Sequence, residues 1–186
     1  ILVTVNPSFQ AQELAYVLNQ SRSAGLFLMP EVRGNPMLAH LEAVRADCPE
    51  LREVVRFDEW DDFLASGTDQ TMALPGVTAG DACMIQYTSG TTGFPKGAVL
   101  HHRGLVNNGF HVAQRMGVPD GGTYVGYMPL FHTGGCVLVV LGALARRCRL
   151  VLVEAFEPGL VLELIEAYEA SAMGGVPAML IAMIEH

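Results

Sequence analysis

The stretch YTSGTTGFPKG, residues 87–97, combines hydroxyl side chains, glycines and one lysine. Hydroxyl and backbone N–H groups donate hydrogen bonds to phosphate oxygens, glycine lets the backbone approach an anion closely, and lysine adds a positive charge. An apolar run precedes the stretch at Ala82–Tyr87, and a second follows it at Ala98–Leu100. We therefore predict a loop between two strands, at the edge of a sheet, that binds the phosphates of a nucleotide.

The spacing within the loop differs from two common phosphate-binding motifs. The Walker motif places lysine directly after its second glycine, and a Ser or Thr after the lysine. Here Pro95 precedes Lys96 and Gly97 follows it, while Gly90 and Gly93 are three positions apart. The dinucleotide fingerprint needs G-x-G at the start of a helix, and the loop contains no G-x-G. The stretch therefore belongs to neither class.

The stretch instead resembles the signature of the adenylate-forming enzymes, Tyr-Thr-Ser-Gly-Thr-Thr-Gly-x-Pro-Lys-Gly, at every fixed position. This superfamily includes acyl-CoA synthetases, peptide-synthetase adenylation domains and beetle luciferases. Val99–His102 and Met128–Gly135 resemble its following segments, and the opening, Val5–Leu18, is similar to the acyl-CoA synthetase branch. By this resemblance, the chain is identified as a member of the adenylate-forming (AMP-binding) superfamily, in its acyl-CoA synthetase branch.

The resemblance implies an ATP-dependent acid–thiol ligase. Such an enzyme makes an acyl-adenylate and pyrophosphate from ATP and a carboxylic acid, and then transfers the acyl group to the thiol of coenzyme A. It also implies Mg²⁺, for which the sequence indicates no ligand set. The family's adenosine-binding segments and C-terminal lid are not found before His186. We therefore expect residues 1–186 to be a single partial AMP-binding domain, truncated at both ends, that needs the remainder of its chain and is inactive alone.

The loop is predicted to stabilise the charge that develops on the leaving pyrophosphate. Its hydroxyl groups can donate hydrogen bonds, its glycines can present backbone N–H groups, and Lys96 can supply a mobile positive charge with a catalytic role. The nucleotide-binding residues are therefore predicted to be Thr88, Ser89, Gly90, Thr91, Thr92, Gly93 and Lys96. A Gly/Ser/Thr-rich turn without a ligand is the alternative, which the complete signature disfavours.

A second candidate site surrounds His132. By resemblance, this position lies beside the carboxylate substrate, so His132 is expected to take part in catalysis by orienting or gating the substrate rather than as a general base. Gly134 and Gly135 would then leave room for the acyl chain in the substrate pocket. A buried histidine with satisfied hydrogen bonds is the alternative for His132. His101 and His102 have no metal-ligand partner in the sequence and are not expected to bind a metal.

Two other functions remain open. The chain could be a non-catalytic nucleotide-binding or interaction module, in which case replacing Lys96 and Thr92 by alanine would leave thioester formation unchanged. It could also be a phosphotransferase, which would release ADP rather than AMP and pyrophosphate. The carboxylic acid is open as well, since pocket residues that distinguish fatty, aryl and amino acids lie largely downstream. The acceptor, coenzyme A or a carrier protein, and the oligomeric state are also open.

The composition excludes several classes of partner. A net charge of −8, with 11 Lys and Arg scattered among 186 residues, provides no basic stripe for nucleic acid. The apolar run Cys136–Leu141, which reaches only Ala145 even across Gly142, is much shorter than the roughly 18 residues of a membrane span. Nothing at Ile1–Val5 is typical of a signal peptide, and the four cysteines contain no C-x-x-C pair. We therefore expect a cytoplasmic protein with reduced thiols.

The hydrophobic pattern predicts an α/β fold, with a mostly parallel sheet and helices on both faces, as an incomplete portion of the adenylate-forming N-terminal domain. The first five elements follow a βαβαβ order, which implies parallel strands, and Ser8 is a plausible cap for the first helix. Residues 58–81 are expected to be a surface connection with one short helix. Strands are predicted at 3–5, 25–29, 53–57, 82–87, 98–100, 123–127, 148–153 and 172–176, and helices at 9–20, 37–47, 102–116, 136–145, 158–169 and from 177.

Overall fold

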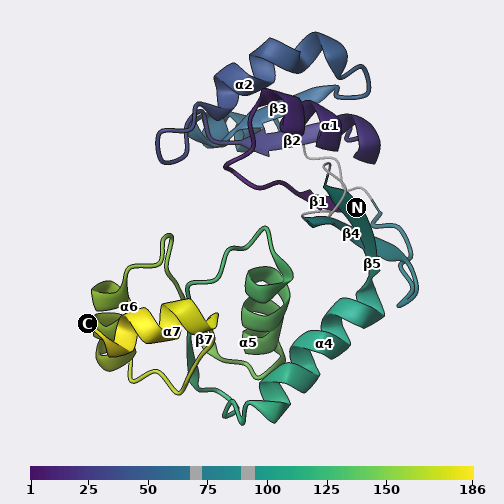
Figure 1. The fold of residues 1–186 in the computed structure, drawn as a ribbon. Helices are drawn as coiled ribbons and strands as arrows, with labels where there is room; N and C mark the ends of the chain where they lie inside the picture. The colour runs from purple at the N-terminus through teal and green to yellow at the C-terminus, as the bar shows by residue number, and fades with distance from the viewer. Residues whose placement is uncertain (68–72, 89–94) are drawn as a thin grey trace. The chain divides into compact units, whose positions relative to one another are not determined.

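The computed structural model describes residues 1–67, 73–88 and 95–186 (Figure 1). The predicted loop residues Ser89, Gly90, Thr91, Thr92 and Gly93 therefore lie outside the described residues. The chain divides into two compact units. Unit 1 comprises Ile1–Thr78 and Cys83–Val99, and unit 2 comprises Ala79–Ala82 and Leu100–His186.

Unit 1 holds two small sheets. β1 (Leu2–Thr4) pairs in parallel with β4 (Ala82–Thr88), and β4 lies next to β5 (Lys96–His101), so the strands that flank the phosphate loop are neighbours. β2 (Gly25–Leu28) and β3 (Glu53–Arg56) form a separate parallel pair. The predicted βαβαβ order and its parallel strands are confirmed. However, β1 pairs with β4 rather than with β2, so the three strands are divided between two sheets.

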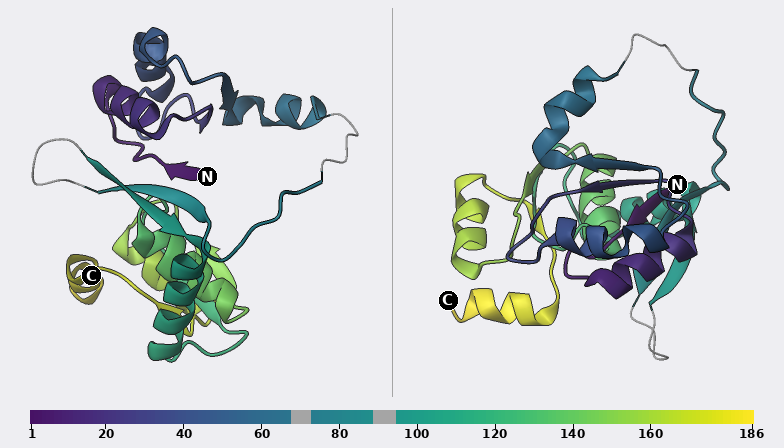
Figure 2. Two further views of the ribbon diagram at one scale, coloured as in Figure 1. Left: turned by 90° about the vertical axis from the view of Figure 1, so that its right-hand side faces the viewer. Right: turned by 90° about the horizontal axis from the view of Figure 1, so that it is seen from above.

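The helices of unit 1 build its core. α1 (Ala11–Ser21) and α2 (Met37–Val44) lie side by side (Figure 2). Leu14 and Leu18, four residues apart on one face of α1, pack with Leu41 of α2 and Leu28 of β2 in one buried cluster. Three short helical segments complete the unit, namely 3-10 turns at Arg45–Asp47 and Phe57–Glu59 and α3 at Trp60–Ala65.

α1 begins at Ala11, and the prediction that Ser8 caps it is wrong. The backbone N–H of Ser8 donates to Asn6 Oδ1 at 2.9 Å, and that of Phe9 donates to the Asn6 carbonyl at 3.0 Å, so this segment forms a turn. Gln10 is the N-cap residue instead, and its backbone N–H donates to the Glu13 carboxylate at 3.0 Å. The Asn6 turn thus delays the start of the helix.

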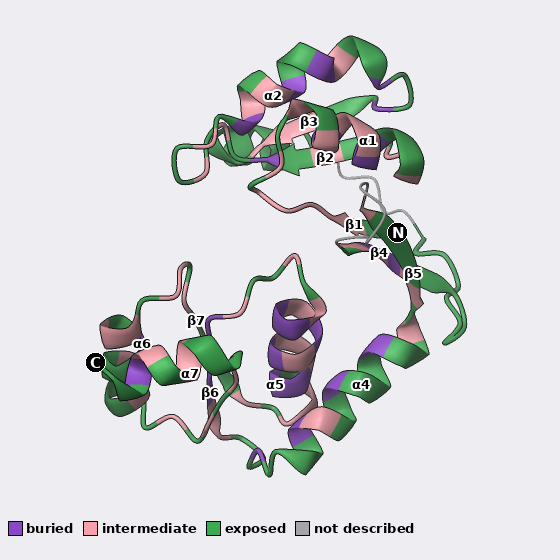
Figure 3. Cartoon of the chain, in the orientation of Figure 1, coloured by how far each residue is buried: buried purple, intermediate pink, exposed green. Residues whose placement is uncertain are grey.

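The sheet of unit 2 has a central strand with parallel neighbours on both sides. β6 (Thr123–Gly126) lies between β7 (Arg149–Leu152) and β8 (Ala172–Met173). Successive residues of a strand point to opposite faces of its sheet. Tyr124 and Val125 are both buried, and β6 is therefore covered on both faces (Figure 3).

Helices supply this cover, as predicted. Their bounds are α4 His102–Arg115, the π-helix η3 Gly134–Leu141, α5 Gly142–Ala145, α6 Pro158–Ala167 and α7 Pro177–Ile184. Tyr124 belongs to a cluster with Ala113 of α4, Val139 of η3 and Ala143 of α5. Val125 belongs to a second cluster, with residues of α6 and α7. The predicted α/β fold with helices on both faces of a parallel sheet is therefore confirmed in unit 2.

Two elements of unit 2 differ from their predicted form. The helix predicted at residues 136–145 begins at Gly134, and its first part is a π-helix rather than an α-helix. The strand predicted at 172–176 ends at Met173, because the chain leaves the sheet before the proline that begins α7. Within the part of the chain that the structure describes, no helix is long and apolar enough to cross a membrane.

Candidate functional site

Two of the predicted nucleotide-binding residues lie at the ends of the strands that flank the loop. β4 ends at Thr88 and β5 begins at Lys96, and both residues are exposed. Because the two strands are neighbours in one sheet, they form the base of the loop. Exposure leaves the Thr88 hydroxyl and the Lys96 ammonium accessible to a ligand. The other five predicted residues, 89–93, lie outside the described residues.

Tyr87 connects the loop's first strand to α1. Its ring meets that of Tyr16 edge-on, with centroids 6.5 Å apart and planes at 75°. Its hydroxyl donates to the carbonyl of Val17 at 3.4 Å. Burial raises the pKa of Tyr87, and the nearby Tyr16 raises it further. A hydrogen bond with Ser21 lowers this pKa by a smaller amount. The phenol is therefore protonated at neutral pH.

Because Gly97 has no side chain, the side chains of Tyr87 and Ile85 can pack against its backbone. A Cβ at Gly97 would lie 3.1 Å from Ile85 Cγ2 and 3.2 Å from Tyr87 Cζ, which is tighter than most carbon contacts. The first and last residues of the signature are thus packed against each other. Neither Tyr87 nor Gly97 was predicted to have a role, although their fixed places in the signature were a signal that both matter.

His132 is exposed, and a backbone N–H holds its imidazole ring. The N–H of Gly134 donates to His132 Nδ1 at 3.0 Å. The main chain of His132 is fixed as well, since its N–H donates to the Pro129 carbonyl at 3.1 Å and its carbonyl accepts from Gly135 and Cys136 at 3.0 and 3.1 Å. The alternative of a buried His132 is therefore wrong. Its expected place beside the substrate stays a prediction.

Gly134 and Gly135 are buried where the His132 turn enters η3. A Cβ at Gly135 would lie 2.2 Å from the carbonyl oxygen of Pro129 and 2.6 Å from that of Met128. A Cβ at Gly134 would lie 2.9 Å from Met128 Cε. Atoms of the turn itself therefore fill the space beside both glycines, which explains why no side chain is present there. Their part in leaving room for an acyl chain stays a prediction.

The turn that carries His132 is anchored by close packing of η3 in unit 2. A Cβ at Gly126, the last residue of β6, would lie 2.4 Å from Val139 Cγ1 of η3. A Cβ at Gly109 of α4 would lie 2.8 Å from Leu141 Cβ. The later part of η3 therefore packs closely against β6 and α4, where only glycine leaves enough room. π-Helices are rare and frequently lie at functional sites, which makes η3 a suitable neighbour for a substrate-side residue.

The family resemblance implies Mg²⁺, so possible metal ligands among the described residues are relevant. Within residues 1–67, 73–88 and 95–186, no group of three or more His, Cys, Asp or Glu side chains is placed to hold a metal ion. Mg²⁺ is usually held by only one or two carboxylates together with water and substrate phosphates, so the implied Mg²⁺ stays a prediction.

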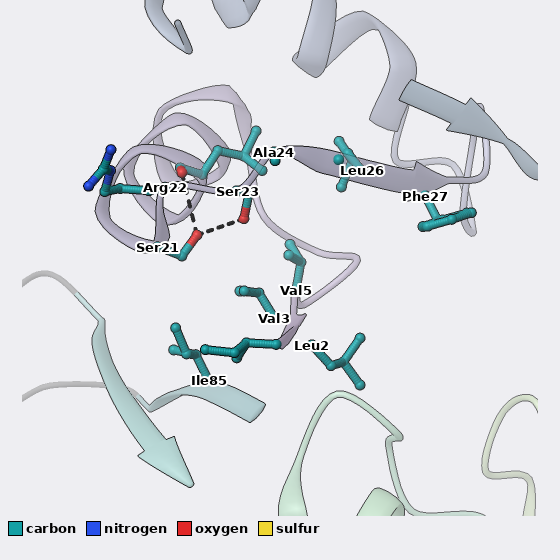
Figure 4. Close-up of a pocket in the computed structure, with 13 residues that line it drawn as sticks. Leu2, Val3, Val5, Ser21, Arg22, Ser23, Ala24, Leu26, Phe27 and Ile85 are labelled. Carbon is teal, nitrogen blue, oxygen red and sulfur yellow. Dashed lines mark hydrogen bonds between the residues drawn. The ribbon is translucent and has the colours of Figure 1, made fainter. Parts of the chain in front are cut away.

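A cavity of about 600 Å³ lies in unit 1 between β1 and the segment from the end of α1 into β2 (Figure 4). Its lining is largely apolar and includes Leu2, Val5 and Leu26. Ser21 Oγ, at its edge, donates to a carbonyl of α1 at 2.6 Å and lies 2.7 Å from Ser23 Oγ. Of the described loop residues, neither Thr88 nor Lys96 lines this cavity, and the two serine hydroxyls are satisfied locally.

Comparison with known proteins identifies relatives over the whole sequence. The family model of AMP-binding enzymes matches residues 1–186. YngI of Bacillus subtilis (strain 168) is 32% identical over 215 residues, which cover 100% of this chain and 39% of YngI. The feruloyl-CoA synthase of an Amycolatopsis species is 31% identical over 186 residues, covering 100% of this chain and 35% of that protein. The 4-chlorobenzoate–CoA ligase of Pseudomonas sp. (strain CBS-3) is 35% identical over 151 residues, which cover 77% of this chain and 28% of that protein.

The chain thus spans less than half of the length of these relatives, and the same holds for solved structures. The N-terminal domain of FACL13 from Mycobacterium tuberculosis matches with a TM-score of 0.84 at 25% identity, over 99% of this chain and 45% of that chain. A long-chain-fatty-acid–CoA ligase, FadD1 from Archaeoglobus fulgidus, matches with a TM-score of 0.81 at 26% identity, over 98% of this chain and 36% of that chain. Because the family model matches all 186 residues, the chain belongs to the family of AMP-binding enzymes.

Proposed function

We propose that the protein is an AMP-forming acid–thiol ligase, which activates a carboxylic acid with ATP and transfers the acyl group to coenzyme A. The observation that carries the proposal is the complete signature at residues 87–97 in a member of the AMP-binding family. Exposure of Thr88 and Lys96 on the flanking strands supports it. Two relatives are named as a CoA synthase and a CoA ligase, which favours coenzyme A over a carrier protein as acceptor.

In the first half-reaction, a carboxylate oxygen attacks the α-phosphorus of ATP. The bond from that phosphorus to the oxygen bridging to the β-phosphorus breaks, and pyrophosphate leaves with the electron pair. The protein's task is to stabilise the leaving charge. We assign this task to the Lys96 ammonium, together with the hydroxyl and backbone N–H donors of Thr88, Ser89, Gly90, Thr91, Thr92 and Gly93.

In the second half-reaction, the thiol sulfur of coenzyme A attacks the carbonyl carbon of the acyl-adenylate, the thiol proton is lost, and AMP leaves. His132 is proposed to orient the carboxylate before activation, with Gly134 and Gly135 bordering the acyl chain. Mg²⁺ is proposed to accompany ATP. We further propose that residues 1–186 are a single partial AMP-binding domain of a cytoplasmic enzyme, and that they are inactive without the rest of the protein.

The test is carboxylate-dependent exchange of labelled pyrophosphate into ATP by the full-length protein. The acid panel contains ferulate, 4-chlorobenzoate and medium- and long-chain fatty acids, and mass spectrometry identifies the thioester. At least one acid should give exchange, AMP and an acyl-CoA. Formation of ADP would favour a phosphotransferase, whereas ATP binding without turnover on any acid would favour a non-catalytic module.

Two matched variants test the loop. Lys96→Ala should lower kcat/KM by about tenfold to 100-fold, because it removes a charged donor to the leaving group. Arg52→Ala removes another exposed cation of unit 1 and should leave kcat/KM unchanged. Equal effects of the two substitutions would contradict the assigned role of Lys96.

A further inference from the structure

Two histidines of unit 2 use the same ring nitrogen to accept a hydrogen bond from a nearby glycine. His132 Nδ1 accepts from the N–H of Gly134 at 3.0 Å, and His101 Nδ1 accepts from the N–H of Gly104 at 2.8 Å. A backbone N–H is always a donor, so the nitrogen that receives it carries no proton. In a neutral imidazole, the proton must then be on the other nitrogen, Nε2.

The surroundings of His132 favour this arrangement. Gly134 begins η3, and its N–H is one of the groups that a helix leaves unpaired at its first turn, so the contact satisfies a donor that needs a partner. Gly134 is buried while His132 is exposed, so the contact lies at the inner edge of the ring. A Cβ at Gly134 would lie 3.2 Å from His132 Nδ1 and 2.9 Å from Met128 Cε. Only a residue without a side chain lets the ring stay in place undisturbed.

We propose that Gly134 is a positioning residue that holds His132 as the Nε2–H tautomer, so that His132 is a hydrogen-bond donor to a carboxylate oxygen and not a base. This inference rests on the proposed function, which supplies the carboxylate. An ionised carboxylate only accepts hydrogen bonds, so it matches an Nε2–H group. Nε2 cannot take a proton from substrate or thiol because it already carries one, and Nδ1 is occupied by the Gly134 N–H.

The tautomer can be measured without any activity. In the full-length protein labelled with ¹⁵N-histidine, the NMR signals of the imidazole rings distinguish a protonated from an unprotonated nitrogen. The signals that disappear in the His132→Gln variant are those of His132. His132 should show an unprotonated Nδ1 and a protonated Nε2 near neutral pH. A protonated Nδ1, or a mixture of both tautomers, would overturn the proposal.

Kinetics test the positioning role. Gly134→Ala keeps the N–H but places a methyl group against the ring, so the tautomers of His132 should become mixed and the KM for the carboxylic acid should rise by about tenfold. The KM for ATP should not change. Gly104→Ala is the matched control, since its Cβ would lie 3.0 Å from His101 Cε1 and 3.2 Å from His101 Nδ1. It should disturb the tautomer of His101 and leave the carboxylate KM as in the wild type.

A second pair of variants covers the case in which Gly134→Ala does not fold. His132→Gln can place an amide N–H near the position of Nε2, whereas His132→Asn can place its oxygen only near the position of Nδ1. Gln should therefore retain a lower carboxylate KM than Asn, and the reverse order would overturn the donor role. If no acid supports pyrophosphate exchange, the proposed function fails, while the ¹⁵N signals still decide whether Gly134 fixes the tautomer.

Discussion

Tyr87 and Gly97 lie against each other, with Tyr87 Cζ at 3.2 Å from the position that a Cβ on Gly97 would take. These residues begin and end the stretch predicted to bind phosphate, and they sit on the two strands that flank it. The contact explains two positions of the signature that offer no obvious donor to a phosphate. They pack together on the two flanking strands, whereas the hydroxyl groups and Lys96 are the residues proposed to bind the phosphates.

Gly97→Ala is expected to destabilise the protein. The added methyl group would press on Tyr87 and Ile85, and overpacking of this kind lowers the free energy of unfolding by roughly 1–3 kcal/mol. Urea denaturation gives the difference. Gly76→Ala is the control, because a Cβ at Gly76 would meet nothing within 4 Å. Equal denaturation midpoints for the two variants would show that the contact is unimportant.

Gly135→Ala is expected to be more damaging. Its Cβ would lie 2.2 Å from the carbonyl oxygen of Pro129, and this backbone cannot move aside without breaking the turn that carries His132. A loss of about 3 kcal/mol or more in the free energy of unfolding is expected, together with loss of activity. Gly142→Ala is the matched control, because its Cβ would make only ordinary contacts at 3.5 Å and alanine favours helix. A Gly135→Ala protein as stable as Gly142→Ala would contradict this account of the turn.

Stability should fall as the pH rises above about 10, the ordinary pKa of a tyrosine in an unfolded chain. Burial raises the pKa of Tyr124, with smaller contributions from Tyr127 and Cys148. The folded state therefore keeps the Tyr124 proton at a pH where the unfolded state has lost it. Between these two pKa values, one such group lowers the free energy of unfolding by about 1.4 kcal/mol per pH unit. Tyr124→Phe should remove this part of the slope, and an unchanged slope in alkaline denaturation would refute its cause.

ATP should protect Lys96 from chemical modification. Lys96 is the only lysine among the 186 residues and is exposed, so an amine-acylating reagent should modify its peptide readily in the free protein. If the ammonium binds the β- and γ-phosphates, ATP should slow this reaction severalfold, while AMP should have little effect. Mass spectrometry of the peptide after short exposure gives the rates. Equal protection by ATP and AMP would place the phosphate contact elsewhere.

The elements that sequence predicted well are those with a clear local pattern. The spacing of Leu14 and Leu18 and of Met37 and Leu41 marked two helices. Except for the run at 172–176, each apolar run ended within one residue of the end of its strand. The signature at residues 87–97 was sufficient to identify the family, because so many positions are specified within a short stretch. Local order and motif chemistry could thus be predicted from residues alone.

Features that depend on residues far apart in the sequence could not be predicted from the sequence. β1 pairs with β4, about eighty positions away, and nothing in the short run at its start distinguishes this partner from β2. The π-helix η3 lies in a run so uniformly apolar that it has no stripe from which the number of residues per turn could be inferred. The Nδ1 contact of His132 depends on a turn geometry that the residue types alone do not specify.

The hydrogen bond from Tyr87 to the carbonyl of Val17 should also limit where this chain can be recombined with a relative. It joins positions 70 residues apart, and the edge-on pair with Tyr16 reinforces it. A chimaera with a crossover between α1 and β4 would combine the Tyr87 of one parent with the Tyr16 and Val17 of another. Functional hybrids should therefore tolerate crossovers outside this interval better than within it, unless both parents carry the same aromatic pair.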